Sequence, residues 1–141
     1  MPRLDIKISV QTADLYDDAG NLVRSYRVST SRKRGRPARK HCIRQKLPDR
    51  PPGEIYTPAL AQQFPDRDWI LTRILWLSGC EPKINRLGDV DTMRRYIYIH
   101  GSPDSVAIGR PGSIGCIRMN NNDLCYLFEQ VSRGTSVKIR E

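Results

Sequence analysis

The chain of 141 residues is long enough for one compact domain, and its 38% hydrophobic content excludes global disorder. It carries 24 Lys and Arg against 15 Asp and Glu, a formal net charge of +9. Such a surface should attract polyanions such as nucleic acid, an anionic membrane face or an acidic cell-wall polymer. No stretch approaches the roughly 20 apolar residues of a membrane helix, so we expect a single domain over residues 1–141 without a membrane span.

The N-terminus shows no apolar segment typical of a signal peptide, which leaves a cytoplasmic location open. The four cysteines include no Cys-x-x-Cys pair, so their spacing argues against a zinc site and against a disulfide framework. We expect Cys42, Cys80 and Cys125 to be free, partly buried thiols, and we expect neither a metal nor a cofactor.

In chain order, apolar residues alternate with polar ones over residues 4–10 and predict a half-buried first strand. A second strand is predicted around Leu15. The polar cluster 17–21 contains a glycine and predicts a turn, after which the alternation resumes over residues 22–29. These elements together indicate a hairpin or a meander.

The basic residues 31–40 have no apolar periodicity and predict a loop, and the proline-rich residues 47–58 should also be irregular. Residues 69–77 are rich in aromatic and β-branched side chains, which favours a central strand that is apolar on both faces. Residues 96–99 predict another strand, which delivers His100 at its end.

Residues 120–123 supply capping side chains for a helix over about 124–131, with Gly134 in the position of a C-terminal stop. Alternation over residues 135–140 then predicts a last strand. The sequence therefore predicts one mainly β domain with a short late helix.

The residues with most chemical promise are His100 at a strand end and Cys116 in a glycine-flanked turn. A thiol attacks as the thiolate, and a neighbouring imidazole can accept its proton. Gly115 would let backbone N–H groups face a bound carbonyl and form an oxyanion hole. By chemistry alone, a structural histidine and a buried cysteine explain the pair equally well.

Three motifs carry a resemblance to a known family: Ile-His-Gly at 99–101, Ile-Gly at 108–109 and Ser-Ile-Gly-Cys-Ile-Arg-Met at 113–119. Together with Gly-Thr-Ser-Val at 134–137, they resemble the L,D-transpeptidase catalytic domain of the YkuD type. The resemblance covers most of the chain. It implies a mainly β domain, an L,D-transpeptidase-like β-sandwich with a short helix in the C-terminal region.

The resemblance also implies an activity on peptidoglycan stem peptides. Cys116 would attack the carbonyl between an L-centre and a terminal D-residue, with His100 as the base and the Gly101 carbonyl orienting the imidazole. Transfer of the acyl group to an amine would give transpeptidation, and transfer to water would give L,D-carboxypeptidation. A cell-envelope (periplasmic) location and sensitivity to carbapenem-type inhibitors are further expectations.

Ser113 and Gly115 would shape the oxyanion turn in such an enzyme, and Arg118 would lie near the substrate. From the residues alone, Arg118 is otherwise a surface side chain or a partner of Asp123.

The sequence departs from the family pattern at two places. Members carry histidine directly before the Gly-Cys pair, where this chain has Ile114, so we expect weakened activity. The alternative is a catalytically inactive peptidoglycan-binding module. Residues 36–41 replace the usual Thr-Pro-x-Gly element, and His41 there is either a substrate contact or an ordinary loop histidine.

The basic loop supports a third interpretation. Arg-Gly-Arg-Pro at Arg34–Pro37 resembles an AT-hook, in which arginines enter the minor groove of DNA. Binding of nucleic acid through residues 33–40 therefore remains an alternative to a solvated basic loop.

Overall fold

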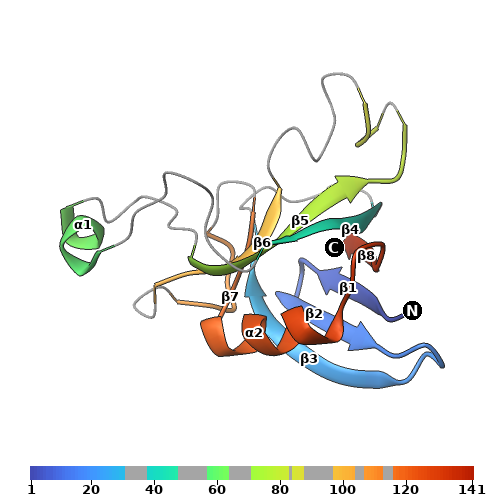
Figure 1. Ribbon diagram of the computed structural model, residues 1–141, viewed down its shortest axis with the longest axis horizontal. Helices are drawn as coiled ribbons and strands as arrows, with labels where there is room; N and C mark the ends of the chain where they lie inside the picture. Colours follow the sequence, from blue (N-terminus) through green and yellow to red (C-terminus); the bar gives the residue numbers. More distant parts are fainter. Residues whose placement is uncertain are drawn as a thin grey trace.

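The computed structural model of the protein describes residues 1–30, 38–47, 57–63, 71–82, 84–87, 97–103, 107–112 and 116–141. The described residues form strands β1 to β8 and helices α1 and α2, with α2 late in the chain (Figure 1). The expected mainly β fold with a short late helix is therefore confirmed.

The chain opens with a three-stranded meander. Strands β1 (Arg3–Lys7), β2 (Thr12–Tyr16) and β3 (Leu22–Ser29) pair antiparallel in chain order, as predicted. The first strand is shorter than expected because the chain turns after it. Gln11 has a positive φ of 54°, and its side-chain amide donates to the Ile8 carbonyl oxygen at 2.8 Å.

The predicted turn between β2 and β3 is present and is held by one carboxylate. Asp17 Oδ1 accepts hydrogen bonds from the backbone N–H groups of Ala19 and Asn21, at 3.0 and 2.9 Å. Gly20 adopts a φ of 85°, which a residue without a Cβ reaches at no steric cost. Sequence chemistry therefore suffices to place this turn.

Strand β4 (Arg39–Leu47) corrects the predicted loop, since its first two residues were assigned to that loop and residues 31–37 lie outside the described residues. Buried His41 and Ile43 alternate with the more exposed Lys40, Cys42 and Arg44, so the two basic residues on the outer face hide the apolar period of the strand. Strand β5 (Leu71–Gly79) pairs with it antiparallel.

Strands β6 (Tyr98–Gly101) and β7 (Ile117–Met119) lie side by side and are parallel, and β5 pairs with the other edge of β6. The sequence predicted β6 but missed β7. Three residues are too few to show a period.

Helix α1 (Pro58–Gln63) lies apart from the sheet, whereas α2 (Asn121–Gln130) packs on β5 and β6 (Figure 1). The predicted cap is confirmed, because the Asn120 side chain accepts a hydrogen bond from a backbone N–H of the first helical turn at 2.9 Å. Gly134, with φ of 91°, belongs to the turn before β8 (Ser136–Arg140) and does not end the helix.

Strand β8 closes the sheet, because it pairs parallel with β1 and antiparallel with β4. The strand order around the closed sheet is β1-β2-β3-β7-β6-β5-β4-β8. The described strands thus form one closed sheet.

The core fills the inside of this sheet. Side chains at every second position of the strands point inward, and α2 adds two leucines. The buried cluster comprises Leu4, Ile6, Ala13, Leu15, Tyr26, Val28, Ile43, Leu75, Leu77, Ile99, Ile117, Met119, Leu124, Leu127, Val131 and Val137.

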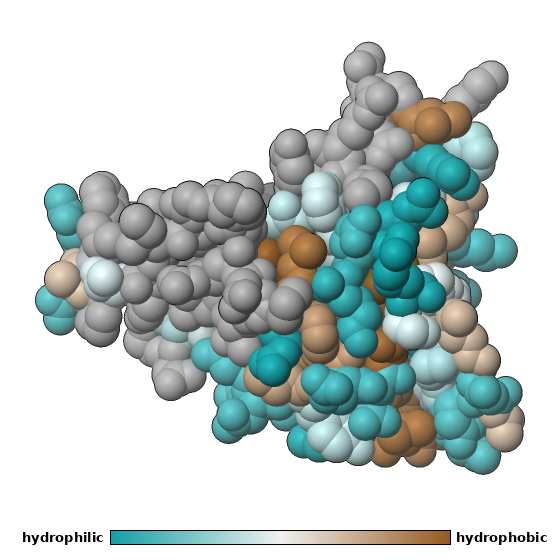
Figure 2. Space-filling view, in the orientation of Figure 1, coloured by the Kyte–Doolittle hydropathy of each residue, from teal (hydrophilic) through white to brown (hydrophobic). Residues whose placement is uncertain are grey.

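The described outer surface is mostly hydrophilic on the face shown in Figure 2, with smaller areas of hydrophobic residues between. Neither described helix is long and apolar enough to cross a membrane.

Two matched leucine substitutions test this division between core and surface. Leu77→Ala in β5 removes a fully buried side chain and should lower the free energy of unfolding by about 2–5 kcal/mol. Leu22→Ala in β3, where the side chain is 57% exposed, should change it by no more than about 0.5 kcal/mol. Urea denaturation of both variants measures the difference, and equal losses would contradict the inward orientation of Leu77.

Candidate functional site

Strand β6 places His100 in a fully buried position with a defined ring orientation. His100 Nδ1 lies 2.6 Å from the carbonyl oxygen of Gly101. A carbonyl oxygen can only accept, so Nδ1 carries the proton and the neutral ring has its lone pair on Nε2. The backbone therefore selects the tautomer in which Nε2 can act as a base.

The parallel pairing of β6 and β7 brings the cysteine segment beside this histidine. Ile99 pairs with Ile117 and His100 pairs with Arg118, and half-buried Cys116 directly precedes β7. The two isoleucines point into the core, so His100 and Arg118 share the opposite face of the sheet. Cys116 lies two positions before Arg118, next to the start of β6.

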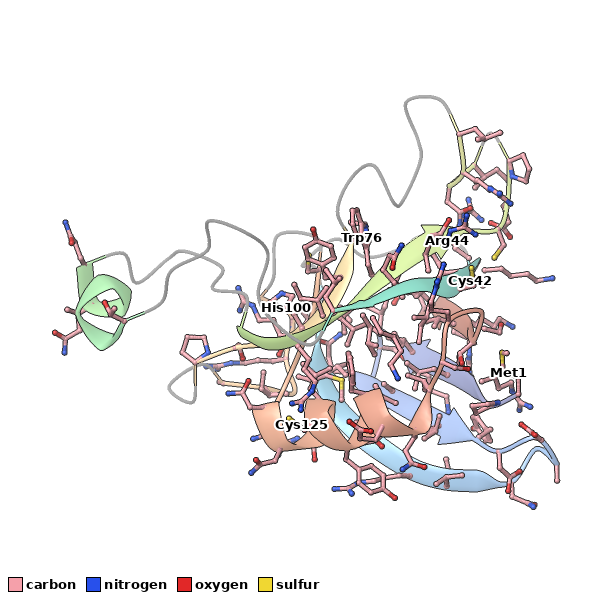
Figure 3. All side chains as sticks on the ribbon, in the orientation of Figure 1. Met1, Cys42, Arg44, Trp76, His100 and Cys125 are labelled. Carbon is pink, nitrogen blue, oxygen red and sulfur yellow. The ribbon has the colours of Figure 1, made fainter. Side chains whose placement is uncertain are left out.

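An aromatic pair lies beside His100 on the same face. Trp76 of β5 pairs in register with Tyr98 of β6, and their rings meet edge to face with centroids 5.6 Å apart. Ile74 pairs with His100 itself. Figure 3 shows His100 and Trp76 on these adjoining strands. The sequence indicated both aromatic residues only as strand formers, although the alternation of Tyr98 with His100 predicts that the two share one face of the strand.

The chain between His100 and Cys116 is anchored to the end of β3. The backbone N–H of Gly112 donates to the Thr30 carbonyl oxygen at 3.0 Å, and that of Gly109 donates to Ser29 Oγ at 3.2 Å. Ser29 also pairs in register with Arg118. Gly109 and Gly112, which precede Cys116 in the chain, are therefore fixed to the end of β3, the strand next to β7.

Helix α2 is joined to the histidine strand at its first turn. Asn121 Nδ2 donates to the carbonyl oxygen of Ser102 at 2.9 Å, just after Gly101. Helix and strand thus hold each other at the end of β6 where His100 lies.

The predicted site residues fall into two groups. His100, Gly101, Arg118 and Cys116 come together where β6 meets β7. Ser113, Ile114 and Gly115 lie outside the described residues, as does the AT-hook-like segment Arg34–Pro37. The carboxylate of Asp123, considered as a partner of Arg118, pairs with Arg24 at 3.3 Å.

Two expectations about single residues are wrong. His41 is no loop residue: it lies in β4 with 7% exposure, and its Nε2 is 3.5 Å from Asn85 Nδ2. Cys80 is exposed, whereas Cys42 and Cys125 are half-buried as expected. None of the four cysteines forms a disulfide.

Within the described part of the chain, no group of three or more histidine, cysteine or acidic side chains could hold a metal ion. The β6–β7 junction brings together a thiol, an imidazole and a guanidinium group.

Solved structures with a similar fold are L,D-transpeptidases. An L,D-transpeptidase from Mycobacterium smegmatis aligns with 99% of this chain and 58% of its own, with a TM-score of 0.62 and 18% identity. The structure of LdtMt1 in complex with imipenem aligns with 98% of this chain and 58% of its own (TM-score 0.61, 17% identity). L,D-transpeptidase 3 from Mycobacterium tuberculosis, in complex with a faropenem-derived adduct, aligns with 99% of this chain and 61% of its own (TM-score 0.58, 19% identity).

Among curated proteins, the probable L,D-transpeptidase ErfK/SrfK of Salmonella typhimurium is 47% identical over 45 residues. That match spans 32% of this chain and 15% of the relative, and the Escherichia coli protein of the same name matches equally over 14% of its length. The YkuD family, described as the L,D-transpeptidase catalytic domain, matches residues 2–139. This chain therefore belongs to the YkuD family of L,D-transpeptidase catalytic domains.

Proposed function

We propose that the protein is a cysteine-dependent L,D-transpeptidase that acts on peptidoglycan stem peptides, with Cys116 as nucleophile and His100 as base. The observation that carries the proposal is the 2.6 Å contact of His100 Nδ1 with the Gly101 carbonyl, on the strand beside Cys116. An imidazole oriented in this way offers Nε2 to a neighbouring thiol, as a general base requires.

The first half of the reaction forms an acyl-enzyme. His100 Nε2 takes the thiol proton, and the Cys116 thiolate attacks the carbonyl carbon between the L-centre and the terminal D-residue of the donor stem. The tetrahedral intermediate collapses, the C–N bond breaks, and the leaving amine takes the proton from the imidazolium. A thioester on Cys116 and a free D-amino acid result.

The second half resolves the thioester. An amine of an acceptor stem, or water, attacks the thioester carbonyl and gives its proton to His100. The C–S bond breaks, and the Cys116 thiolate takes the proton back. With an amine the product is a crosslink, and with water the same chemistry is L,D-carboxypeptidation.

The developing oxyanion needs hydrogen-bond donors, and we assign that role to backbone N–H groups of the segment Ser113 to Cys116, for which the sequence predicts a turn. Arg118 shares the sheet face of His100, so its guanidinium is suited to bind a carboxylate of the stem peptide. Trp76 and Tyr98 offer an aromatic wall next to the same face.

Family membership supports this substrate class, and it also supports a cell-envelope (periplasmic) location for the proposed activity, because peptidoglycan lies there. The similar structures with imipenem and with a faropenem-derived adduct support the further proposal that carbapenem-type β-lactams acylate Cys116.

Incubation with a disaccharide-tetrapeptide, followed by mass spectrometry, tests the proposed function. We expect loss of the terminal D-residue together with a crosslinked dimer, or with the tripeptide alone if water is the acceptor. Binding of the muropeptide without either product would instead identify an inactive peptidoglycan-binding module.

The substitution Ile114→His tests whether the departure from the family motif weakens the enzyme. An isoleucine side chain offers neither a donor nor a base, whereas a histidine would add a hydrogen-bond donor next to the nucleophile. Loss of one such donor costs about 10²–10³ in rate at comparable sites. We therefore expect Ile114→His to raise the rate of Cys116 acylation by up to about 10²–10³. Intact mass over time measures this rate.

The matched control for this test is Ile114→Leu, which keeps an apolar side chain of the same size. It should leave the acylation rate close to that of the wild type. An Ile114→His variant no faster than this control would show that position 114 does not limit the reaction.

A further inference from the structure

Two cysteines that are distant in the sequence lie together at the end of the β4–β5 ladder. Cys42 pairs with Ser78 and His41 with Gly79, while the backbone N–H of Cys80 donates to the Lys40 carbonyl oxygen at 3.0 Å. Side chains alternate along a strand, so Cys42 and Cys80 are diagonal neighbours on one face of the sheet.

The two thiols are close enough to interact directly. The pKa of the Cys80 thiol is raised above its ordinary value, first by partial burial of the sulfur and next by the charge of Cys42 and a hydrogen bond between the two thiols. Two thiols that lie on one face of paired strands and influence each other in this way are candidates for a disulfide.

The turn that follows β5 holds Cys80 in this place without help from the sulfurs. Asn85 Nδ2 donates to the Lys40 carbonyl oxygen at 3.0 Å, and Asn85 Oδ1 accepts the backbone N–H of Glu81 at 2.9 Å. Asn85 packs so tightly on Gly79 that a Cβ there would clash with its carbonyl oxygen. The turn is therefore tied to β4, and Cys80 is kept beside Cys42.

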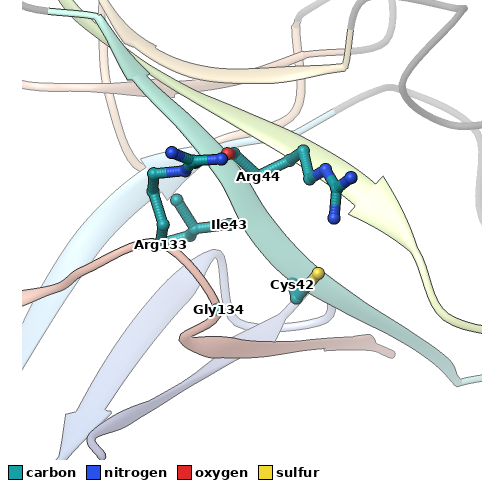
Figure 4. Close-up of a pocket in the computed structure, with 5 residues that line it drawn as sticks. All are labelled: Cys42, Ile43, Arg44, Arg133 and Gly134. Carbon is teal, nitrogen blue, oxygen red and sulfur yellow. Dashed lines mark hydrogen bonds between the residues drawn. The ribbon is translucent and has the colours of Figure 1, made fainter.

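Cys42 also lines an open pocket of about 300 Å³ (Figure 4). Its lining residues are Cys42, Ile43, Arg44, Arg133 and Gly134. The exposed side chains of Arg44 and Arg133 give the pocket a positive rim, and Arg133 Nε donates to the Arg44 carbonyl oxygen at 3.0 Å. A small disulfide molecule can thus approach Cys42, while Cys80 is exposed beside it.

We propose that Cys42 and Cys80 form a reversible disulfide by exchange with a low-molecular-weight disulfide. The Cys42 thiolate attacks one sulfur of the donor, whose S–S bond breaks to release one thiol and leave a mixed disulfide on Cys42. The Cys80 thiolate then attacks the Cys42 sulfur and releases the second thiol. The protein loses two electrons and two protons, and the donor disulfide gains them as two thiols.

The disulfide would cross-link the end of β5 to β4 and close the long chain segment between them. Strand β5 pairs with β6, with Ile74 opposite His100. In the oxidised protein, the disulfide should therefore make the strand next to His100 more rigid. Closing a long loop restricts the unfolded chain, so oxidation should raise the melting temperature by on the order of 5–10 °C.

The test uses the full chain with Cys116→Ser and Cys125→Ser, so that only the proposed pair remains. The protein is equilibrated in glutathione buffers of increasing oxidised fraction, quenched in acid, treated with a maleimide and weighed intact. We expect a species that is lighter by two hydrogen atoms and carries neither maleimide nor glutathione, with a higher melting temperature. Peptide mapping without reductant should recover the two cysteines in one linked pair.

The further substitutions Cys42→Ser and Cys80→Ser are the matched controls. Each should give only a glutathione adduct on the remaining thiol, without the rise in melting temperature. Two maleimide labels at every buffer ratio, separate glutathione adducts on both cysteines, or disulfide-linked dimers would overturn the proposal. Because none of these readouts uses turnover, the outcome is independent of the proposed transpeptidase activity.

Discussion

Replacing Cys116 with alanine should abolish the covalent adduct that we expect the wild-type protein to form with a carbapenem. The β-lactam carbonyl takes the place of the donor amide, and only a thiolate next to a base can open the ring at a useful rate. Where a nucleophile and its base act as a unit, removing the nucleophile costs about 10⁶ in turnover. Intact mass after incubation with imipenem measures the adduct.

Cys125→Ala is the matched control for this prediction. Cys125 of α2 is half-buried like Cys116, but its sulfur accepts a hydrogen bond from Arg73 Nη1 of β5 at 2.6 Å. Exposure therefore does not distinguish the two thiols, and only activation by an imidazole would. An adduct that persists in Cys116→Ala, or disappears in Cys125→Ala, would contradict the assignment of the nucleophile.

Replacing His100 with alanine should lower the rate of Cys116 acylation by about 10²–10⁴, the usual contribution of a positioned general base. The fully buried ring, oriented by the Gly101 carbonyl, has no substitute among the other described side chains of β6. The pH profile should change as well, because an unassisted thiol reacts only as it ionises, with a reference pKa of about 8.5. The rate of acylation, measured by intact mass in samples quenched at timed intervals over a series of pH values, reports both effects.

His41→Ala separates this role from a purely structural one. His41 is the other histidine of the chain. It is buried in β4, which does not pair with β6, and its ring lies beside Asn85. Its loss should reduce stability but leave the acylation rate of folded protein and its pH profile nearly unchanged. If both histidine variants slow acylation to the same extent, His100 is not the base.

The sequence predicted the strands whose apolar residues form a visible alternation or run, and it missed strands where other constraints decide. The alternation around Leu4 and Ile6, and the doubly apolar run of β5, are visible because burial selects the side chains directly. The lysines and arginines of β4 conceal a strand whose inner positions include Ile43. The short β7 forms because β3 and β6 pair with it on both sides. This pairing depends on the tertiary structure, and the local sequence pattern does not show it.

The candidate site was predictable in its residues and not in its geometry. The motif around Cys116 and His100 named the pair, but the parallel register of His100 with Arg118 follows from the order of strands in the sheet. The same holds for Cys42 and Cys80, whose separation in the chain gave no sign of their contact. Local patterns identify chemical groups, and long-range strand pairing decides which of them meet.

The ladder that closes the sheet joins the first strand to the last, with Arg3 opposite Ser136. Contacts between positions so far apart in the chain are slow to form, because the entropy of a large loop is lost before any pairing energy is gained. Until β8 arrives, β1 and β4 expose unpaired backbone along one edge each. Those two edges are where a partly folded chain would recruit another copy of itself, so misassembly should begin there when refolding is attempted at high protein concentration.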